Sequence, residues 1–180
     1  MKLTSSLFFL FGGLTASAAV IDKSTTSSFQ LYAYGKGIGG LPVYYSDGNA
    51  FVGSKFPSGS NLNTNISFAP SSSSEWVITP TTSNVTLTNT TSPVLFIDPS
   101  GTALTNVGFT GSSSSNGTTK GFISFGNWAM WKNPSTSRIA SNFYATPVSD
   151  GVWQLKWNAE EIDDGSSISV AVRKVAPTTE

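Results

Sequence analysis

The sequence predicts a single all-β domain, a compact antiparallel β-trefoil-like fold without disulfides, with a β-sandwich as the alternative. Apolar and polar residues alternate with a period of two along many short segments, and turn-forming residues separate those segments. Turns at Asp47, Asp98 and Asp150 recur at intervals of 51 and 52 residues, and Trp76 and Trp128 lie 52 apart. This spacing favours the threefold repeat of a trefoil, although evenly spaced hairpins in a sandwich also produce weak repeats.

The first predicted strands lie in FQLYAYGKGIGGLPVYYSDGNAFVG, residues 29–53. Gly35, Gly37 and Gly40 fit the spacing of a dinucleotide-binding fingerprint, which requires a helix to follow the glycines. Here Gly40 is followed by LPVYY, which is β-branched and aromatic and contains proline. We therefore expect the glycines to connect two strands, and the second strand to enter a hairpin whose turn is Asp47-Gly48.

The same alternation predicts about eleven strands along the whole chain. Only residues 158–163 have the composition for a single helical turn. Further turns are expected at residues 98–101, 150–151 and 164–165. The strand phases predict buried side chains at Ile66, Phe68, Val85, Leu87, Trp153, Leu155, Trp157, Ile168, Val170 and Val172.

The first residues, MKLTSSLFFLFGGLTASAAV, combine one lysine, an apolar run and small residues that suit signal peptidase. This pattern predicts a secretory signal peptide over residues 1–18. We expect a short flexible segment at 19–28, one β domain at 29–176 and a C-terminal tail at 177–180. The protein is then secreted and released.

The charge content argues against nucleic-acid and membrane partners, because only 11% of residues are charged and ten basic side chains balance ten acidic ones. The chain also has no histidine and no cysteine. It cannot form a Ser-His-Asp triad, a Cys-His pair or an imidazole or thiolate metal site. We expect no catalytic residues, no cofactor and no metal.

Carboxylates remain as acid and base groups, and a glycoside hydrolase needs two of them facing across a cleft. Most have a turn role, in which the side chain accepts bonds from nearby backbone amides. The cluster EEIDDG lacks the ligand spacing of a calcium-binding loop. We expect a solvated acidic turn there, and keep a carboxylate-based hydrolase as the second alternative function. The candidates are Asp47, Glu75, Asp98, Asp150, Glu160, Glu161, Asp163 and Asp164.

Four N-glycosylation acceptor sequences are present, at Asn65, Asn84, Asn89 and Asn116. The predicted strand phases bury Ile66 and Val85, which turns Asn65 and Asn84 outward. We predict a glycoprotein, with Asn89 and Asn116 in the most accessible loops.

Aromatic side chains suggest a surface that contacts a ligand, since tyrosine and tryptophan faces stack on sugar rings. Candidates are Tyr32, Tyr34, Tyr44, Trp128 and Trp131. Alternation does not decide which of Trp128 and Trp131 faces outward, because residues three apart on a strand lie on opposite faces. A lectin-like carbohydrate-binding module is therefore the first alternative function.

The stretches FQLYAYGKGIGGLPVYYSDGNAFVG, SEWVITPTTSNVTLT, WAMWKN and DGVWQLKWN resemble the small secreted proteins of filamentous fungi that carry the name IgE-binding protein. The likeness covers nearly the whole chain after residue 18. It implies an extracellular glycoprotein recognised by host immunity, which in plant-infecting fungi elicits defence and cell death in the apoplast. The implied partners are plant apoplastic proteins or immune receptors, and IgE. The family supplies no catalytic residues, so we expect a non-enzymatic effector-like protein.

Overall fold

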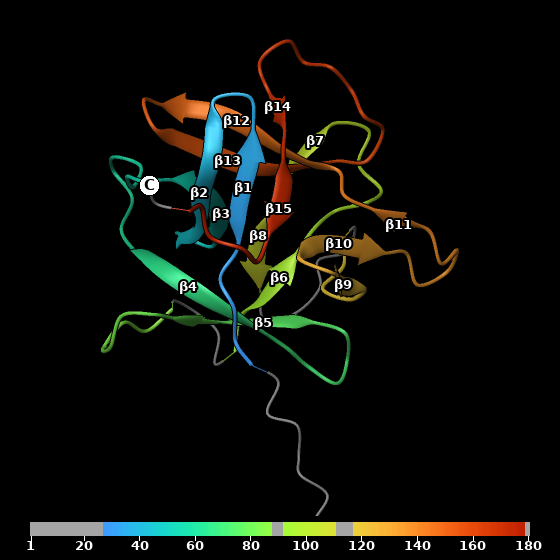
Figure 1. Ribbon diagram of the computed structural model, residues 1–180, viewed down its shortest axis with the longest axis horizontal. Helices are drawn as coiled ribbons and strands as arrows, with labels where there is room; N and C mark the ends of the chain where they lie inside the picture. Colours follow the sequence, from blue (N-terminus) through green and yellow to red (C-terminus); the bar gives the residue numbers. More distant parts are fainter. Residues whose placement is uncertain (1–26, 88–91, 111–116, 179–180) are drawn as a thin grey trace, which may run out of the picture.

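The computed structural model describes residues 27–87, 92–110 and 117–178. These ranges contain fifteen strands with antiparallel pairings throughout, and no helix (Figure 1). The all-β prediction is confirmed. The single helical turn expected at 158–163 is absent, because strand β13 continues to Asn158 and a turn follows it. The described residues contain no helix that is long and apolar enough to cross a membrane.

The strands are short, and most alternate between buried and exposed side chains. In chain order they are β1 (Tyr32–Gly35), β2 (Ile38–Ser46), β3 (Asn49–Gly53), β4 (Asn63–Pro70), β5 (Trp76–Pro80), β6 (Val94–Phe96), β7 (Leu104–Asn106), β8 (Gly108–Thr110), β9 (Phe122–Phe125), β10 (Trp128–Lys132), β11 (Ile139–Ala140), β12 (Phe143–Ser149), β13 (Val152–Asn158), β14 (Ile168–Ser169) and β15 (Ala171–Arg173).

Six strands close into a barrel. The pairings run from β2 to β4, β5, β6, β8 and β3, and β3 pairs again with β2. Strands β13, β12 and β14 extend from β3, while β1, β15 and β10 extend from β2. In Figure 1, β12 and β13 cross the top of the molecule and β4 and β5 cross the bottom. A closed barrel has no separate facing sheets, so the sandwich alternative is not what the chain forms.

The two ends of the described chain meet in the sheet. Ala33 on β1 pairs with Val172 on β15, and Trp128 on β10 pairs with Arg173 on the other side of β15. Figure 1 shows β1 and β15 side by side. This pairing brings together residues that lie nearly the full domain length apart, and it creates the surface described below.

The core consists of the side chains that the strands turn inward, and its largest members are aromatic. Trp157 is 1% exposed and contacts Trp131 and Phe143 edge to face, with ring centroids 6.0 and 5.0 Å apart. Phe68 is fully buried beside Trp76. Such pairs add about 0.5–1.5 kcal/mol each to the free energy gained by burial.

Most predicted facings are correct. Ile66, Phe68, Leu155 and Val170 are buried, as is Val172. Trp153 was predicted to lie in the core and is only half-buried, although it packs against the core. Its position explains the difference, since it is the second residue of β13 after the β12–β13 turn and lies beside a register shift in β12. Ile168 is likewise half-buried.

The strand expected around Val85 and Leu87 is wrong for the described residues of that segment. Strand β5 ends at Pro80, and residues 85–87 form no strand. Asn84 lies in a turn with a positive φ of 67°. Leu87 is nevertheless buried, and Val85 is half-buried. The alternating pattern therefore predicted the burial of Leu87 correctly. It did not predict a strand correctly, because no described strand pairs with residues 85–87.

The Asp47-Gly48 turn is confirmed. It joins the paired residues Ser46 and Asn49, and both turn residues have positive φ, 43° and 85°. The Asp47 carboxylate also accepts hydrogen bonds from the backbone amides of Asn61 and Leu62, each at 2.9 Å. The turn residue therefore fastens the loop that precedes β4.

We expect Asp47→Ala to lower the free energy of unfolding by about 2 kcal/mol, because it removes two charge-assisted bonds and places alanine at a left-handed backbone position. Asp47→Asn tolerates that backbone and keeps one acceptor oxygen, so its loss should be smaller. Equilibrium urea unfolding measures both. No loss for Asp47→Ala would show that the carboxylate bonds contribute nothing.

Candidate functional site

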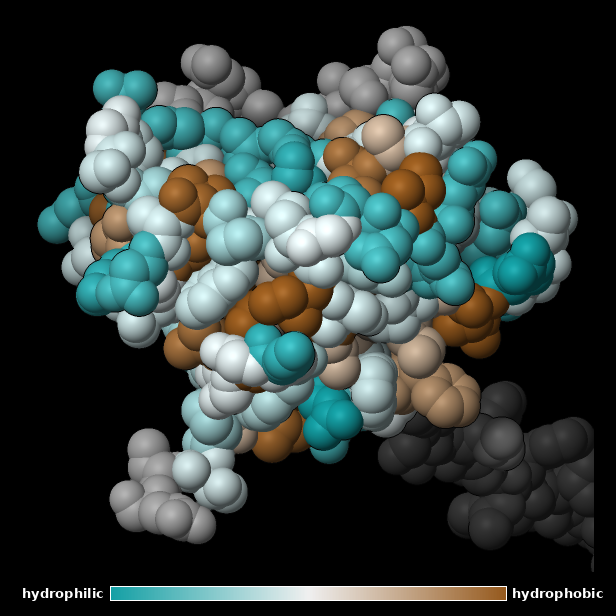
Figure 2. Space-filling view, turned by 90° about the horizontal axis from the view of Figure 1, so that it is seen from above, coloured by the Kyte–Doolittle hydropathy of each residue, from teal (hydrophilic) through white to brown (hydrophobic). Residues whose placement is uncertain are grey.

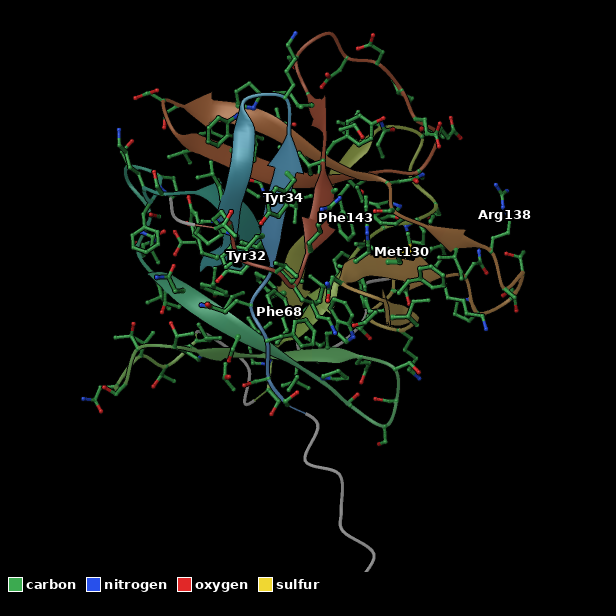
Figure 3. The ribbon with its side chains drawn as sticks, viewed as in Figure 1. Tyr32, Tyr34, Phe68, Met130, Arg138 and Phe143 are labelled. Atoms are coloured by element: carbon green, nitrogen blue, oxygen red, sulfur yellow. The ribbon has the colours of Figure 1, made fainter. Side chains whose placement is uncertain are left out.

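A groove with aromatic walls lies where β1, β15 and the β9–β10 turn meet the C-terminal segment. We call it the aromatic groove; its volume is about 680 Å³. Figure 3 shows Tyr34 projecting from β1 beside β15. On the face seen in Figure 2, hydrophobic side chains form separate patches divided by polar ones. The aromatic groove is lined by Tyr34, Phe125, Gly126, Asn127, Trp128, Arg173, Val175, Ala176, Pro177 and Thr178.

Arg173 stands between two aromatic rings of this groove. Its guanidinium carbon lies 4.3 Å from the ring centroid of Trp128 and 5.4 Å from that of Tyr34. Cation–π attraction of this kind contributes about 0.5–2 kcal/mol, more when water is excluded. The contacts hold the side chain of Arg173 in one place on the groove wall.

The local sequence explains how Tyr34 reaches this position. Gly40 has a φ of 81°, and a Cβ atom there would lie 2.8 Å from the Tyr34 ring and 2.9 Å from Pro177. Only glycine allows both the backbone conformation and the close approach of the ring. The Tyr34 hydroxyl donates a hydrogen bond to the carbonyl of Val175 at 2.7 Å, which fixes the C-terminal segment. Of the glycines predicted to connect two strands, Gly37 lies in the connection, whereas Gly35 ends β1 and Gly40 lies within β2, where it supports the groove.

The structure brings two of the five predicted aromatic residues together. Tyr34 and Trp128 line the aromatic groove, and Trp128 is the outward member of its pair at 36% exposed. Tyr32 is half-buried on β1, and its hydroxyl donates to Gln30.

The other two predictions are wrong. Tyr44 is 1% exposed, its hydroxyl donates to the carbonyl of Lys55, and burial raises its pKa to about 12. It is buried because Phe51 and Phe56 cover the side of β2 that alternation would leave open. Trp131 is 7% exposed and packs on Trp157, with its indole N–H donating to Lys120.

Sequence reasoning missed two residues of the groove. Arg173 follows the buried Val172 on β15, so the strand phase predicts only that its side chain faces outward. The phase does not predict which side chains lie beside it. Phe125 is 64% exposed just before the β9–β10 turn. The sequence signal that could have indicated Phe125 is a phenylalanine directly before a glycine turn.

The acceptor asparagines stay predictions. Asn65 is exposed on β4 between buried Thr64 and Ile66, as its strand phase requires, and Asn84 is exposed in its turn. Asn89 and Asn116 lie outside the described residues.

Most candidate carboxylates are engaged locally. Asp98 accepts bonds from the backbone amide and the hydroxyl of Ser100, and Asp163 accepts one from the amide of Gly165. Asp150 pairs with Lys55 at 3.4 Å, with both side chains exposed. The described residues contain no group of three acidic side chains placed to hold a metal ion.

Glu160 and Glu161 line a second groove, of about 530 Å³, between the β10–β11 hairpin and the segment after β13. Arg138 lies on its rim and Trp131 and Trp157 also border it. Figure 3 shows Arg138 pointing away from the barrel. Of the two grooves, this one has candidate carboxylates in its described lining.

Two acidic side chains have lowered pKa values because hydroxyl groups stabilise their ionised forms. Glu75 accepts hydrogen bonds from the hydroxyls of Ser73 and Thr119, both at 2.6 Å, and these lower its pKa. The hydroxyl and amide of Ser167, together with the amide of Ser166, lower the pKa of Asp164 to about 2.

These shifts predict loss of stability in acid. A lowered pKa means that the folded protein binds the proton less tightly than the unfolded chain. The stabilisation is therefore complete above the ordinary value, 4.5 for Glu75, and disappears as pH falls through the folded value. We expect the free energy of unfolding to decrease from about pH 5 toward pH 2, and Glu75→Gln to flatten the upper part of that decrease. Urea unfolding at a series of pH values tests this; identical slopes for both proteins would contradict it.

No known protein family model, no curated protein and no solved structure matches the chain.

Proposed function

We propose that the chain is an exported, non-enzymatic recognition protein whose aromatic groove binds carbohydrate. The observation that carries this proposal is the convergence of Tyr34, Trp128 and Phe125 from three strands onto one groove. Their rings offer apolar faces, and polar groups lie beside them. A sugar ring has an apolar face and polar hydroxyl groups, so this combination can contact both. The groove is also preformed, because Tyr34 is fixed by Val175 and Gly40.

Calorimetry with three neutral oligosaccharides, cellohexaose, xylohexaose and chitohexaose, tests whether the groove binds carbohydrate. We expect binding by at least one of them, weakened about tenfold to hundredfold by Trp128→Ala, since a buried aromatic face contributes about 1.5–3 kcal/mol. Phe56→Ala is the matched control, because Phe56 is 47% exposed and lies outside the groove. Equal losses for the two variants would exclude the groove as the binding site.

The setting is proposed from the family resemblance. In that setting the protein lies in the apoplast or at the fungal surface, where plant apoplastic proteins, immune receptors or IgE recognise it and plant tissue responds with defence and cell death. Leaf infiltration with native protein, boiled protein and overlapping peptides separates a linear epitope from a folded surface. Activity that survives boiling and resides in one peptide would show that the groove has no part in elicitation.

We further propose the β-trefoil arrangement for the barrel and its flanking strands. Five residue pairings and one backbone hydrogen bond support it, because they link the N-terminal, middle and C-terminal thirds in a ring. The pairings are Phe29 with Phe68, Phe68 with Ile78, Phe122 with Trp131, Trp128 with Arg173, and Val172 with Ala33, and the hydrogen bond runs from the amide of Gly121 to the carbonyl of Ser74. The three aspartate turns then occupy corresponding places in the three units. An experimental structure whose three units fail to superpose by a threefold rotation would refute the arrangement.

A further inference from the structure

The charge of Arg173 is not balanced by any acidic side chain among the described residues. No described carboxylate lines the aromatic groove, and within the described ranges Arg173 forms no ion pair. Its Nε atom is buried and has no hydrogen-bond partner. A buried donor on a charged group costs free energy when it stays unpaired, and no acceptor offsets that cost here. The rest of the Arg173 side chain is half-buried and lines the groove, so a ligand there can reach the guanidinium.

The cation–π contacts do not supply that acceptor. A guanidinium carries five N–H donors, and attraction to the rings of Trp128 and Tyr34 uses none of them as hydrogen bonds. The rings instead hold the guanidinium in place before a ligand arrives. Most of the entropy of ordering a long side chain is therefore already lost in the free protein, which favours binding.

The chemistry of this position selects a carboxylate. The planar fork of arginine matches a carboxylate through two parallel hydrogen bonds. The neighbouring cation, Lys174, is directed elsewhere, with its Nζ 4.8 Å from the ring of Phe29. The groove thus offers one positive charge of fixed geometry, surrounded by the exposed rings of Trp128 and Phe125.

We propose that the aromatic groove is selective for acidic saccharides: the carboxylate of a uronic acid residue binds the guanidinium of Arg173, and the sugar ring lies against Trp128 and Phe125. This inference rests on the proposed carbohydrate binding and adds the class of sugar. A hydroxyl oxygen of a neutral sugar can accept a hydrogen bond from the guanidinium but leaves its charge unbalanced, whereas a uronate accepts hydrogen bonds through two oxygens and also neutralises the charge.

Calorimetry with a short oligogalacturonate and with its fully methyl-esterified form tests the inference, because the two ligands differ only in whether each carboxyl group is ionised or carries a methyl ester. We expect the acid to bind about tenfold to hundredfold tighter than the ester, and increasing salt to reduce the difference. This comparison uses the unaltered protein and needs no variant.

Variants then assign the preference to one residue. Arg173→Gln should abolish the preference for the acid, and Arg173→Lys, which keeps the charge but not the fork, should retain part of it. Arg138→Gln is the matched control, since Arg138 is an exposed arginine outside this groove, and it should leave the preference unchanged. Thermal unfolding checks that each variant is folded.

The outcomes separate the two proposals. Equal binding of acid and ester, both weakened by Trp128→Ala, would overturn the acidic selectivity and leave carbohydrate binding intact. Failure of every saccharide to bind would overturn both. Tighter binding of a sulfated oligosaccharide than of the uronate, or a preference that survives Arg173→Gln, would overturn the assignment of a carboxylate to Arg173.

Discussion

Replacing Trp157 by alanine is expected to lower the free energy of unfolding by about 3–5 kcal/mol, the range for a large aromatic side chain lost from a packed core. Trp157 is 1% exposed and contacts Trp131 and Phe143 edge to face. Alanine would leave a cavity that these two rings cannot fill without leaving their own positions. The chain has no cystine that would hold the barrel together after that loss.

Trp153→Ala is the matched control, because the same change is made on the same strand, four residues away. Trp153 is half-buried, so we expect a loss of about 1–2 kcal/mol, part of the burial energy of a large side chain. Equilibrium urea unfolding, with tryptophan fluorescence and circular dichroism as separate probes, measures both variants. A loss for Trp153→Ala equal to that for Trp157→Ala would show that Trp153 lies in the core, as the sequence predicts.

Local features were predictable from the sequence because local chemistry determines them. The Asp47-Gly48 turn follows from two residues that tolerate positive φ, and the inward facings of Leu155 and Val170 follow from the strand period. Tyr44 is the exception. Its side of β2 would be open in an isolated strand, but Phe56, twelve residues later, covers it.

The aromatic groove depends on pairings that no local pattern contains. Tyr34 bonds to Val175, 141 residues later, and Trp128 meets Arg173 across two strands. In the sequence, Tyr34 and Trp128 are two separate aromatic candidates, and no local pattern predicts that they lie close together. Arg173 became a candidate only when the pairing placed its guanidinium between their rings.

Replacing Gly121 by alanine is expected to lower the free energy of unfolding by about 3 kcal/mol or more, because two independent costs add. Gly121 has a φ of 94°, which a residue with a Cβ atom rarely adopts. A Cβ atom would also collide with the carbonyl oxygen of Lys132 and lie 2.9 Å from the indole nitrogen of Trp131. The collision involves backbone, so a side-chain rotation cannot relieve it.

The position of Gly121 makes this strain spread into the core. Its amide donates to the carbonyl of Ser74, and its carbonyl accepts from the amide of Lys132, so the residue connects the segments that carry Trp76 and Trp131. Gly37→Ala is the control, because Gly37 has a similar φ of 73° but no atom within 4 Å of an added Cβ. It should lose only about 1 kcal/mol, the backbone cost alone. Equal losses for the two variants in urea unfolding would show that the contact with Lys132 relaxes freely and that this junction is not rigid.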